Sequence, residues 1–196
     1  MLPEQLGYIA IVIGLFAAGF YVKDTLLGKT KPNRVSWSLW ALAPLIGVFF
    51  QLKAGAGLSV LPIFMAGFGP VLVVLASFVN KNAYWKITRL DIVCGTFSLI
   101  ALVIYVFMHN LSLSILFVIL SDLLAGIPIL VKSWKFPETE TSITFILGTV
   151  NSIIGMLIIK DWSFVIYSFG LYLIIINSTI VLFLYRKKIF KNLARV

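Results

Sequence analysis

The stretch Lys31-Pro32-Asn33-Arg34-Val35-Ser36-Trp37-Ser38 leads into one hydrophobic segment, and the stretch Phe136-Pro137-Glu138-Thr139-Glu140-Thr141-Ser142-Ile143 leads into another. In each stretch a proline is followed by polar residues and by Ser or Thr at the start of the segment. The match extends upstream at one constant spacing, and downstream to a lysine that closes each segment: Leu15-Phe16-Ala17 over Leu124-Ala125-Gly126, Val22-Lys23 over Val131-Lys132, and Lys53 opposite Lys160. This shared layout predicts an internal duplication, with chance coincidence of prolines and lysines as the alternative.

Seven hydrophobic segments account for almost all of the 196 residues. They lie at residues 6–23, 36–51, 58–79, 90–108, 113–131, 141–159 and 163–185. Their lengths are close to the ~20 residues that a helix needs to cross ~30 Å of hydrocarbon. A composition of 61% hydrophobic residues and a mean hydropathy of +1.06 exclude an ordinary soluble domain. We therefore expect one all-α membrane domain with seven transmembrane helices.

The basic residues predict how this domain is oriented. All but two of the 16 lysines and arginines lie in every second gap between the segments or in the C-terminal tail. Loops rich in Lys and Arg stay in the cytoplasm, so the alternation predicts an outside N-terminus and a cytoplasmic C-terminus. The net charge of +9 then reflects orientation and attraction to anionic inner-leaflet lipids. No basic stripe with interleaved aromatic residues indicates binding to nucleic acid.

The predicted duplication requires a linker helix. Three spans invert the direction of a chain, so a second copy faces the wrong way unless one extra span restores its direction. Residues 88–109 supply that span between a first repeat at residues 6–80 and a second repeat at residues 113–186, followed by a basic cytoplasmic tail at residues 187–196. The two three-helix repeats are then parallel and related by an axis along the membrane normal.

This order of three, one and three helices with an outside N-terminus resembles the PQ-loop/SWEET superfamily. That group includes sugar-transporting SWEETs, amino-acid-exporting PQ-loop proteins, KDEL receptors and, more distantly, nicotinamide riboside transporters. The resemblance is one of architecture over roughly residues 6–186, because the Pro-Gln dipeptide that names the family is absent. It implies an alternating-access carrier for a polar or amphiphilic solute, with proton linkage left open. The alternative is a non-transporting ligand receptor or sorting protein of the KDEL-receptor type.

Asp122 lies near the middle of the fifth hydrophobic segment. A carboxylate at that depth costs ~2.5–3.5 kcal/mol on insertion scales, so acids within the membrane usually serve function. No Lys or Arg lies at comparable depth, and desolvation therefore favours the neutral acid, which could exchange a proton or bind a cation. The alternative is a permanently neutral aspartic acid that is hydrogen-bonded to a neighbouring helix.

Two asparagines join Asp122 as candidate substrate-binding residues. Asn151, followed by Ser152, lies near the centre of the sixth segment, and Asn177 lies in the seventh. A buried asparagine needs partners, which it finds on another helix or on a ligand. SWEET transporters carry an asparagine on the seventh helix of their sugar pocket, and Asn177 resembles it in position. Pro70 stands near the aligned position of the first repeat, which disfavours a sugar as the solute.

Trp37 and Trp40 lie one turn apart in the second segment. Trp40 is the deeper of the two and is predicted to present its ring to the solute for stacking or cation–π contact. The other tryptophans are predicted to be interfacial anchors: Trp37, Trp85, Trp134 and Trp162. Helix breakers within the segments are candidate hinge and gate residues: Pro44, Pro70, Pro128, Gly67 and Gly69. The alternative is that the small residues permit close helix packing.

We expect no enzymatic activity, no metal and no cofactor. Cys94 is the only cysteine, which excludes an internal disulfide and a multi-cysteine metal site. His109 is interpreted as an interfacial residue, because no serine or cysteine partner is identifiable. Residues 163–185 lack the lysine that a retinal Schiff base requires. Short loops and the lack of a targeting extension predict a prokaryotic cytoplasmic membrane; homo-oligomer formation and the identity of the solute are left open.

Overall fold

A computed structural model describes residues 2–107 and 110–193, and these residues fold into helices joined by short loops. The α-helices are α1 (Gly7–Leu26), α2 (Arg34–Lys53), α3 (Leu61–Val79), α4 (Arg89–Phe107), α5 (Leu111–Lys135), α6 (Ser142–Leu157) and α7 (Phe164–Leu193). Three 3-10 helices are η1 (Glu4–Leu6), η2 (Leu58–Val60) and η3 (Pro137–Thr139). The predicted all-helical fold is confirmed, and the described residues contain no strand. His109 lies outside the described residues.

Within residues 2–107 and 110–193, five helical stretches are long and apolar enough to cross a membrane. They are Glu4–Leu26, Arg34–Lys53, Leu58–Val79, Leu111–Lys135 and Phe164–Ile189. Helix α6 is apolar but has only 16 residues, or about 24 Å at 1.5 Å per residue. The chain is thus compatible with a multi-pass membrane protein, whereas membrane crossing by α4 and α6 stays a prediction.

Helices α5 and α7 extend furthest beyond the hydrophobic segments that predicted them. Helix α5 continues to Lys135, so Lys132 belongs to a helix and not to a loop. Helix α7 continues to Leu193, so the basic tail predicted at residues 187–196 is helical as far as it is described. Lys, Arg and Leu favour helix and no Gly or Pro interrupts the sequence there, which explains why the helix outlasts its apolar part.

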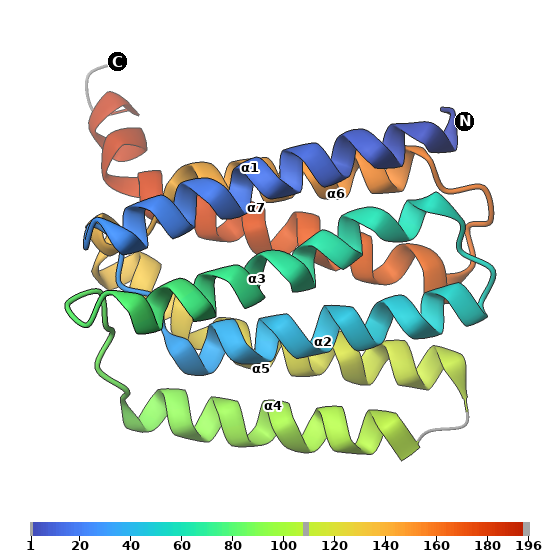
Figure 1. Ribbon diagram of the computed structural model, residues 1–196, viewed down its shortest axis with the longest axis horizontal. Coiled ribbons are helices and arrows are strands. Elements are labelled where there is room, and N and C mark those ends of the chain that lie inside the picture. Colours follow the sequence, from blue (N-terminus) through green and yellow to red (C-terminus); the bar gives the residue numbers. More distant parts are fainter. Residues whose placement is uncertain (1, 108–109, 194–196) are drawn as a thin grey trace.

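Successive helices run in opposite directions with their axes nearly parallel (Figure 1). The loops α1–α2, α3–α4 and α5–α6 therefore gather at the same end as the C-terminal part of α7 (Figure 1). We call this the basic end, because it holds Lys23, Lys29, Lys31, Arg34, Lys81, Lys86, Arg89, Lys132, Lys135 and Arg186. The opposite end comprises the chain around η1 and the loops at residues 54–60 and 158–163.

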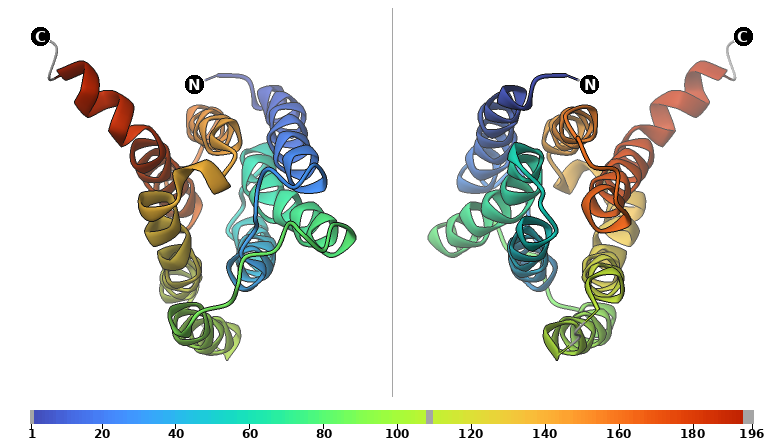
Figure 2. Two further views of the ribbon diagram at one scale, coloured as in Figure 1. Left: turned by 90° about the vertical axis from the view of Figure 1, so that its left-hand side faces the viewer. Right: turned by 90° about the vertical axis from the view of Figure 1, so that its right-hand side faces the viewer.

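The helices form two groups with matching internal contacts. In the first group α1 and α2 both pack on α3, and in the second group α5 and α6 both pack on α7. The groups meet where α1 packs on α6 and α2 packs on α5. Helix α4 packs mainly along α5 and lies on the outside of the assembly (Figure 2). A duplicated chain gives this pattern of contacts, although the duplication itself stays a prediction.

Aromatic side chains fill the seam between the two groups. Tyr21, Trp37, Trp40 and Phe145 belong to one buried cluster that also includes Phe169. The outer faces of the helices carry many exposed large apolar side chains, among them Phe16, Leu75, Phe97 and Ile175. Extended apolar surface of this kind is suited to contact with lipid.

Candidate functional site

A cavity of about 100 Å³ lies in the seam between the two helix groups. Among the described residues, every α-helix except α4 contributes to its lining. All five predicted substrate-binding residues are brought together around it: Trp40, Asp122, Asn151, Ser152 and Asn177. A dry engineered cavity of about 150 Å³ holds benzene, so this space suits several water molecules or a compact solute.

Asp122 of α5 is buried, and one of its two carboxylate oxygens makes no hydrogen bond to the described residues. The hydroxyl of Tyr172 donates to Oδ2 at 2.9 Å, and the indole Nε1 of Trp40 donates to the backbone carbonyl of Asp122 at 3.0 Å. The neighbouring carbonyl, of Ser121, accepts from Ser98 Oγ on α4 at 2.7 Å. These bonds from α2 and α4 fix this turn of α5. Oδ1 of Asp122 has no partner among the described residues, and neither ion pair found there includes this acid.

Asn151 of α6 leaves a second acceptor oxygen unpaired. Its Nδ2 donates to the carbonyl oxygen of Pro62 at 3.5 Å, while its Oδ1 finds no partner within the described part of the chain. This contact favours the present orientation of the amide, because the reverse orientation would place two acceptor oxygens next to each other. The first group thus supplies the carbonyl that orients an asparagine of the second.

Three further polar side chains of the cavity each donate one hydrogen bond to a backbone carbonyl. Ser152 Oγ donates to the carbonyl of Gly148 at 2.9 Å, and Asn177 Nδ2 donates to the carbonyl of Leu173 at 2.8 Å. Thr144 Oγ1 donates to the carbonyl of Ala17 at 2.8 Å. Thr144 and Gly148 were missed by the sequence analysis, although their helical spacing from Ser152 places all three on one face of α6.

The two tryptophans of α2 share one environment. Trp40 lines the cavity as predicted, and its ring lies 5.5 Å from that of Trp37. The prediction that Trp37 is an interfacial anchor is wrong: its side chain is 3% exposed, lines the same cavity and packs 4.3 Å from the ring of Tyr21. The start of α2 is covered by α1 and α6, a tertiary contact that sequence position does not reveal. Trp134 and Trp162 are exposed, and Trp85 is half-buried.

The predicted hinge residues fall into two sets. Pro44, Gly69 and Pro70 line the cavity, whereas Gly67 and Pro128 do not. A β-carbon on Gly67 would lie 2.7 Å from Leu45 Cγ, so this glycine permits close packing of α3 on α2. Helices α2, α3 and α5 continue through their internal prolines, and bending at these positions stays a prediction.

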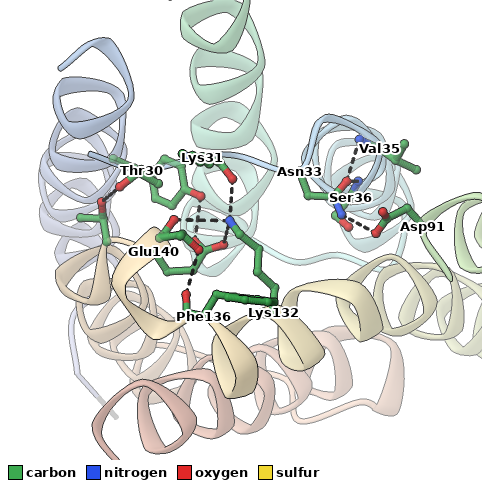
Figure 3. Close-up of polar contacts among 12 residues, drawn as sticks. Thr30, Lys31, Asn33, Val35, Ser36, Asp91, Lys132, Phe136 and Glu140 are labelled. Carbon is green, nitrogen blue, oxygen red and sulfur yellow. Dashed lines mark hydrogen bonds and ion pairs between the residues drawn. The ribbon is translucent and has the colours of Figure 1, made fainter. Parts of the chain in front are cut away.

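A buried polar cluster at the basic end joins the two groups. Lys132 of α5 and Glu140, just before α6, form an ion pair of 2.6 Å, with side-chain exposures of 1% and 0%. Glu140 Oε2 also accepts from the hydroxyl of Tyr21 at 2.7 Å, and Lys132 Nζ donates to the carbonyl of Lys31 at 2.5 Å. Figure 3 shows Lys132 reaching between Glu140 and Lys31. We call Tyr21, Lys132 and Glu140 the latch.

A second layer of hydrogen bonds surrounds the latch. Thr141 Oγ1 donates to Asp24 Oδ2 at 2.8 Å and lies 2.6 Å from Thr30 Oγ1. Beside it, Asn33 caps α2 by accepting from the backbone N–H groups of residues 35 and 36, and its Nδ2 donates to Asp91 Oδ1 at 2.6 Å (Figure 3). The basic end is therefore held by directional bonds that span α1, α2, α4, α5 and α6.

Among the described residues, no group of three His, Cys, Asp or Glu side chains is placed to hold a metal ion. Comparison of the chain with protein-family models, curated proteins and solved structures gives no match.

Proposed function

We propose that the protein is a membrane carrier that moves a small polar or amphiphilic solute through the cavity between its two helix groups. The observation that carries this proposal is a cavity shared by both groups, in which Asp122 and Asn151 each present an unpaired oxygen. Leaving a buried polar atom unpaired costs about 1–3 kcal/mol. A ligand that supplies partners would offset this cost, and three such atoms in one cavity, counting the indole Nε1 of Trp37, favour a binding site over separate defects.

The arrangement of the groups supports transport by rocking. The groups meet mainly through two pairs of helices, α1 with α6 and α2 with α5, with the cavity between them. A void of about 10 Å³ shares Pro62 and Ser152 with the cavity and continues toward the opposite end, where one water fits. At the basic end, the latch closes the seam.

In this proposal, the positive-inside rule places the basic end in the cytoplasm. The latch is then a cytoplasmic gate, and the opposite end is the outer gate. Opening toward the cytoplasm requires Tyr21 of the first group to leave Glu140 of the second. Opening toward the outside leaves these bonds intact, so the described conformation is nearer to an outward-opening state.

The test is uptake into proteoliposomes that contain the purified protein, with labelled glucose, glutamate, lysine and ethanolamine as probes. We expect flux of at least one probe, and Asp122→Asn abolishes that flux and any dependence of it on a pH gradient. The control Asp161→Asn changes an exposed acid at the opposite end and leaves flux unchanged. Binding of a probe by calorimetry without any flux would instead favour the receptor or sorting protein.

A further inference from the structure

We propose that the solute is a compact organic ammonium ion that carries N–H donors, an inference that rests on the carrier proposal. The first reason lies in which hydrogen-bond donors and acceptors of the cavity lining lack partners. Asp122 Oδ1 and Asn151 Oδ1 are buried acceptors with no partner in the described part of the chain. Thr144 and Ser152 each commit their hydroxyl hydrogen to a backbone carbonyl, and Asn177 commits one of its two amide hydrogens in the same way.

Free donors also remain in the lining: the indole N–H of Trp37, which finds no partner among the described residues, and the second amide hydrogen of each of Asn151 and Asn177. Among the described polar atoms of the lining that make no hydrogen bond at all, two are acceptors and one is a donor. A solute that supplies N–H groups satisfies both oxygens, and one acceptor on the same solute could satisfy Trp37. A solute with only acceptors leaves the two oxygens unpaired, at a cost that disfavours its binding.

The charge of the lining residues also favours a cationic solute. Among the described residues around the cavity, Asp122 has the one ionisable side chain, and no Lys, Arg or His faces it. A cation complements this carboxyl, and the rings of Trp37, Trp40 and Phe145 add faces for cation–π attraction. Ca²⁺ fits less well, because it takes 6–8 oxygen ligands and the lining is mostly apolar.

The size of the cavity limits the solute. A volume of about 100 Å³ accepts a molecule of only a few heavy atoms without further opening. Ethanolamine meets these requirements, since it has an ammonium group with N–H donors and one hydroxyl. Choline keeps the positive charge but has three methyl groups in place of the N–H donors, which also makes it larger.

Binding of four small probes to the full chain in lipid nanodiscs tests the inference. Ethanolamine, choline, ethylene glycol and glycolate separate the contributions of N–H donors, charge and size. We expect saturable calorimetric binding and a rise in Tm with ethanolamine, binding of choline weaker by about tenfold or more, and no binding of ethylene glycol or glycolate. Glycolate tests the reverse polarity, in which a protonated Asp122 donates to an anion.

Two variants locate the binding to this cavity. Asp122→Asn and Asn151→Leu each weaken ethanolamine binding by about tenfold or more, because each removes one of the unpaired oxygens. Asp161→Asn, with an exposed side chain, leaves the Kd unchanged. Equal binding of ethanolamine and choline, or preferred binding of glycolate, would overturn the inference even if a variant fails to fold, because the probes compare ligands on the unaltered chain.

The outcomes separate this inference from the carrier proposal. Flux of glucose or glutamate without ethanolamine binding would reject the ammonium solute and keep the carrier. Ethanolamine binding in nanodiscs without flux of any probe into proteoliposomes would reject the carrier and keep the ligand class.

Discussion

At the basic end the two helix groups are joined by short hydrogen bonds between buried polar side chains, whereas at the opposite end they are joined mainly by apolar contacts. The bond from Tyr21 to Glu140 measures 2.7 Å and that from Thr141 to Asp24 measures 2.8 Å. At the opposite end, an apolar cluster of Ala56, Val60, Ile159 and Ile166 spans the seam.

Polar contacts across the seam at the opposite end are fewer and longer. The backbone N–H of Leu2 donates to the carbonyl of Leu157 at 3.4 Å, and Lys160 pairs with Glu4 at 3.2 Å with its own side chain 67% exposed. Apolar burial is non-directional and tolerates sliding, whereas separating Tyr21 from Glu140 and Lys132 from the carbonyl of Lys31 leaves buried polar groups without their partners. The comparison indicates that the opposite end opens at lower cost and that the latch sets the cost of opening the basic end.

The largest expected effect comes from removing the lysine of the latch. Lys132→Met leaves Glu140 buried without its cation, and breaking a buried pair in this way costs about 3–5 kcal/mol. We expect the free energy of unfolding, measured by SDS titration in mixed micelles, to fall by that amount. Hydrogen exchange should also accelerate in residues 27–33, because Lys132 bonds the carbonyl of Lys31 in that loop.

The paired variant Lys132→Met with Glu140→Leu is the control for this prediction. Replacing a whole buried ion pair by apolar side chains is often neutral or stabilising, so the double variant should recover most of the lost stability. If the carrier proposal holds, the double variant lacks a gate that closes firmly and leaks solute at the basic end. A single variant as stable as the unaltered chain would contradict the assignment of the latch.

The second-largest effect is expected at the contact between α3 and α6, on the side of the opposite end. A β-carbon on Gly155 of α6 would lie 2.9 Å from Cγ of Pro62 in α3. We expect Gly155→Ala to lower the free energy of unfolding by about 1–3 kcal/mol, as overpacking does, and to loosen the seam there. Gly19→Ala is the matched control, because its β-carbon meets nothing within 4 Å, and it should be neutral or stabilising by up to about 1 kcal/mol. Equal effects of the two alanines in the SDS titration would contradict close contact across the seam.

Sequence reasoning predicted the helices because hydrophobicity and helix preference are properties of each segment. It also selected Asp122 and Asn151, because a polar residue in mid-membrane is expensive and therefore conspicuous. The structure places both beside one cavity with Trp40, Ser152 and Asn177. Thr144 and Gly148 were missed because neither residue type is unusual in an apolar helix. Their role becomes visible only when the structure shows which face of α6 lines the cavity.

The latch was not predictable from charge patterns. Lys132 was counted among the loop lysines because of its positive charge and its position between two hydrophobic segments. These two properties predict only the side of the membrane on which it lies. Its burial depends on the chain reversal at η3, which brings Glu140 back over the end of α5, and on the approach of Tyr21 from the first group. Trp37 was misassigned for the same reason, since its exposure is decided by α1 and α6. These are contacts between distant parts of the chain that no local pattern contains.

The smallest expected effect comes from the exposed pair at the opposite end. Lys160→Met removes the partner of Glu4, but water screens this pair, and exposed ion pairs contribute about 0–1 kcal/mol. We expect a change of that size in the SDS titration, and a still smaller one at high ionic strength, where exposed charges are screened further. The contrast with Lys132→Met isolates burial as the cause, because each substitution replaces one lysine of an ion pair by methionine. A loss at Lys160 as large as that at Lys132 would mean that both ends are held by charge and that neither opens at lower cost.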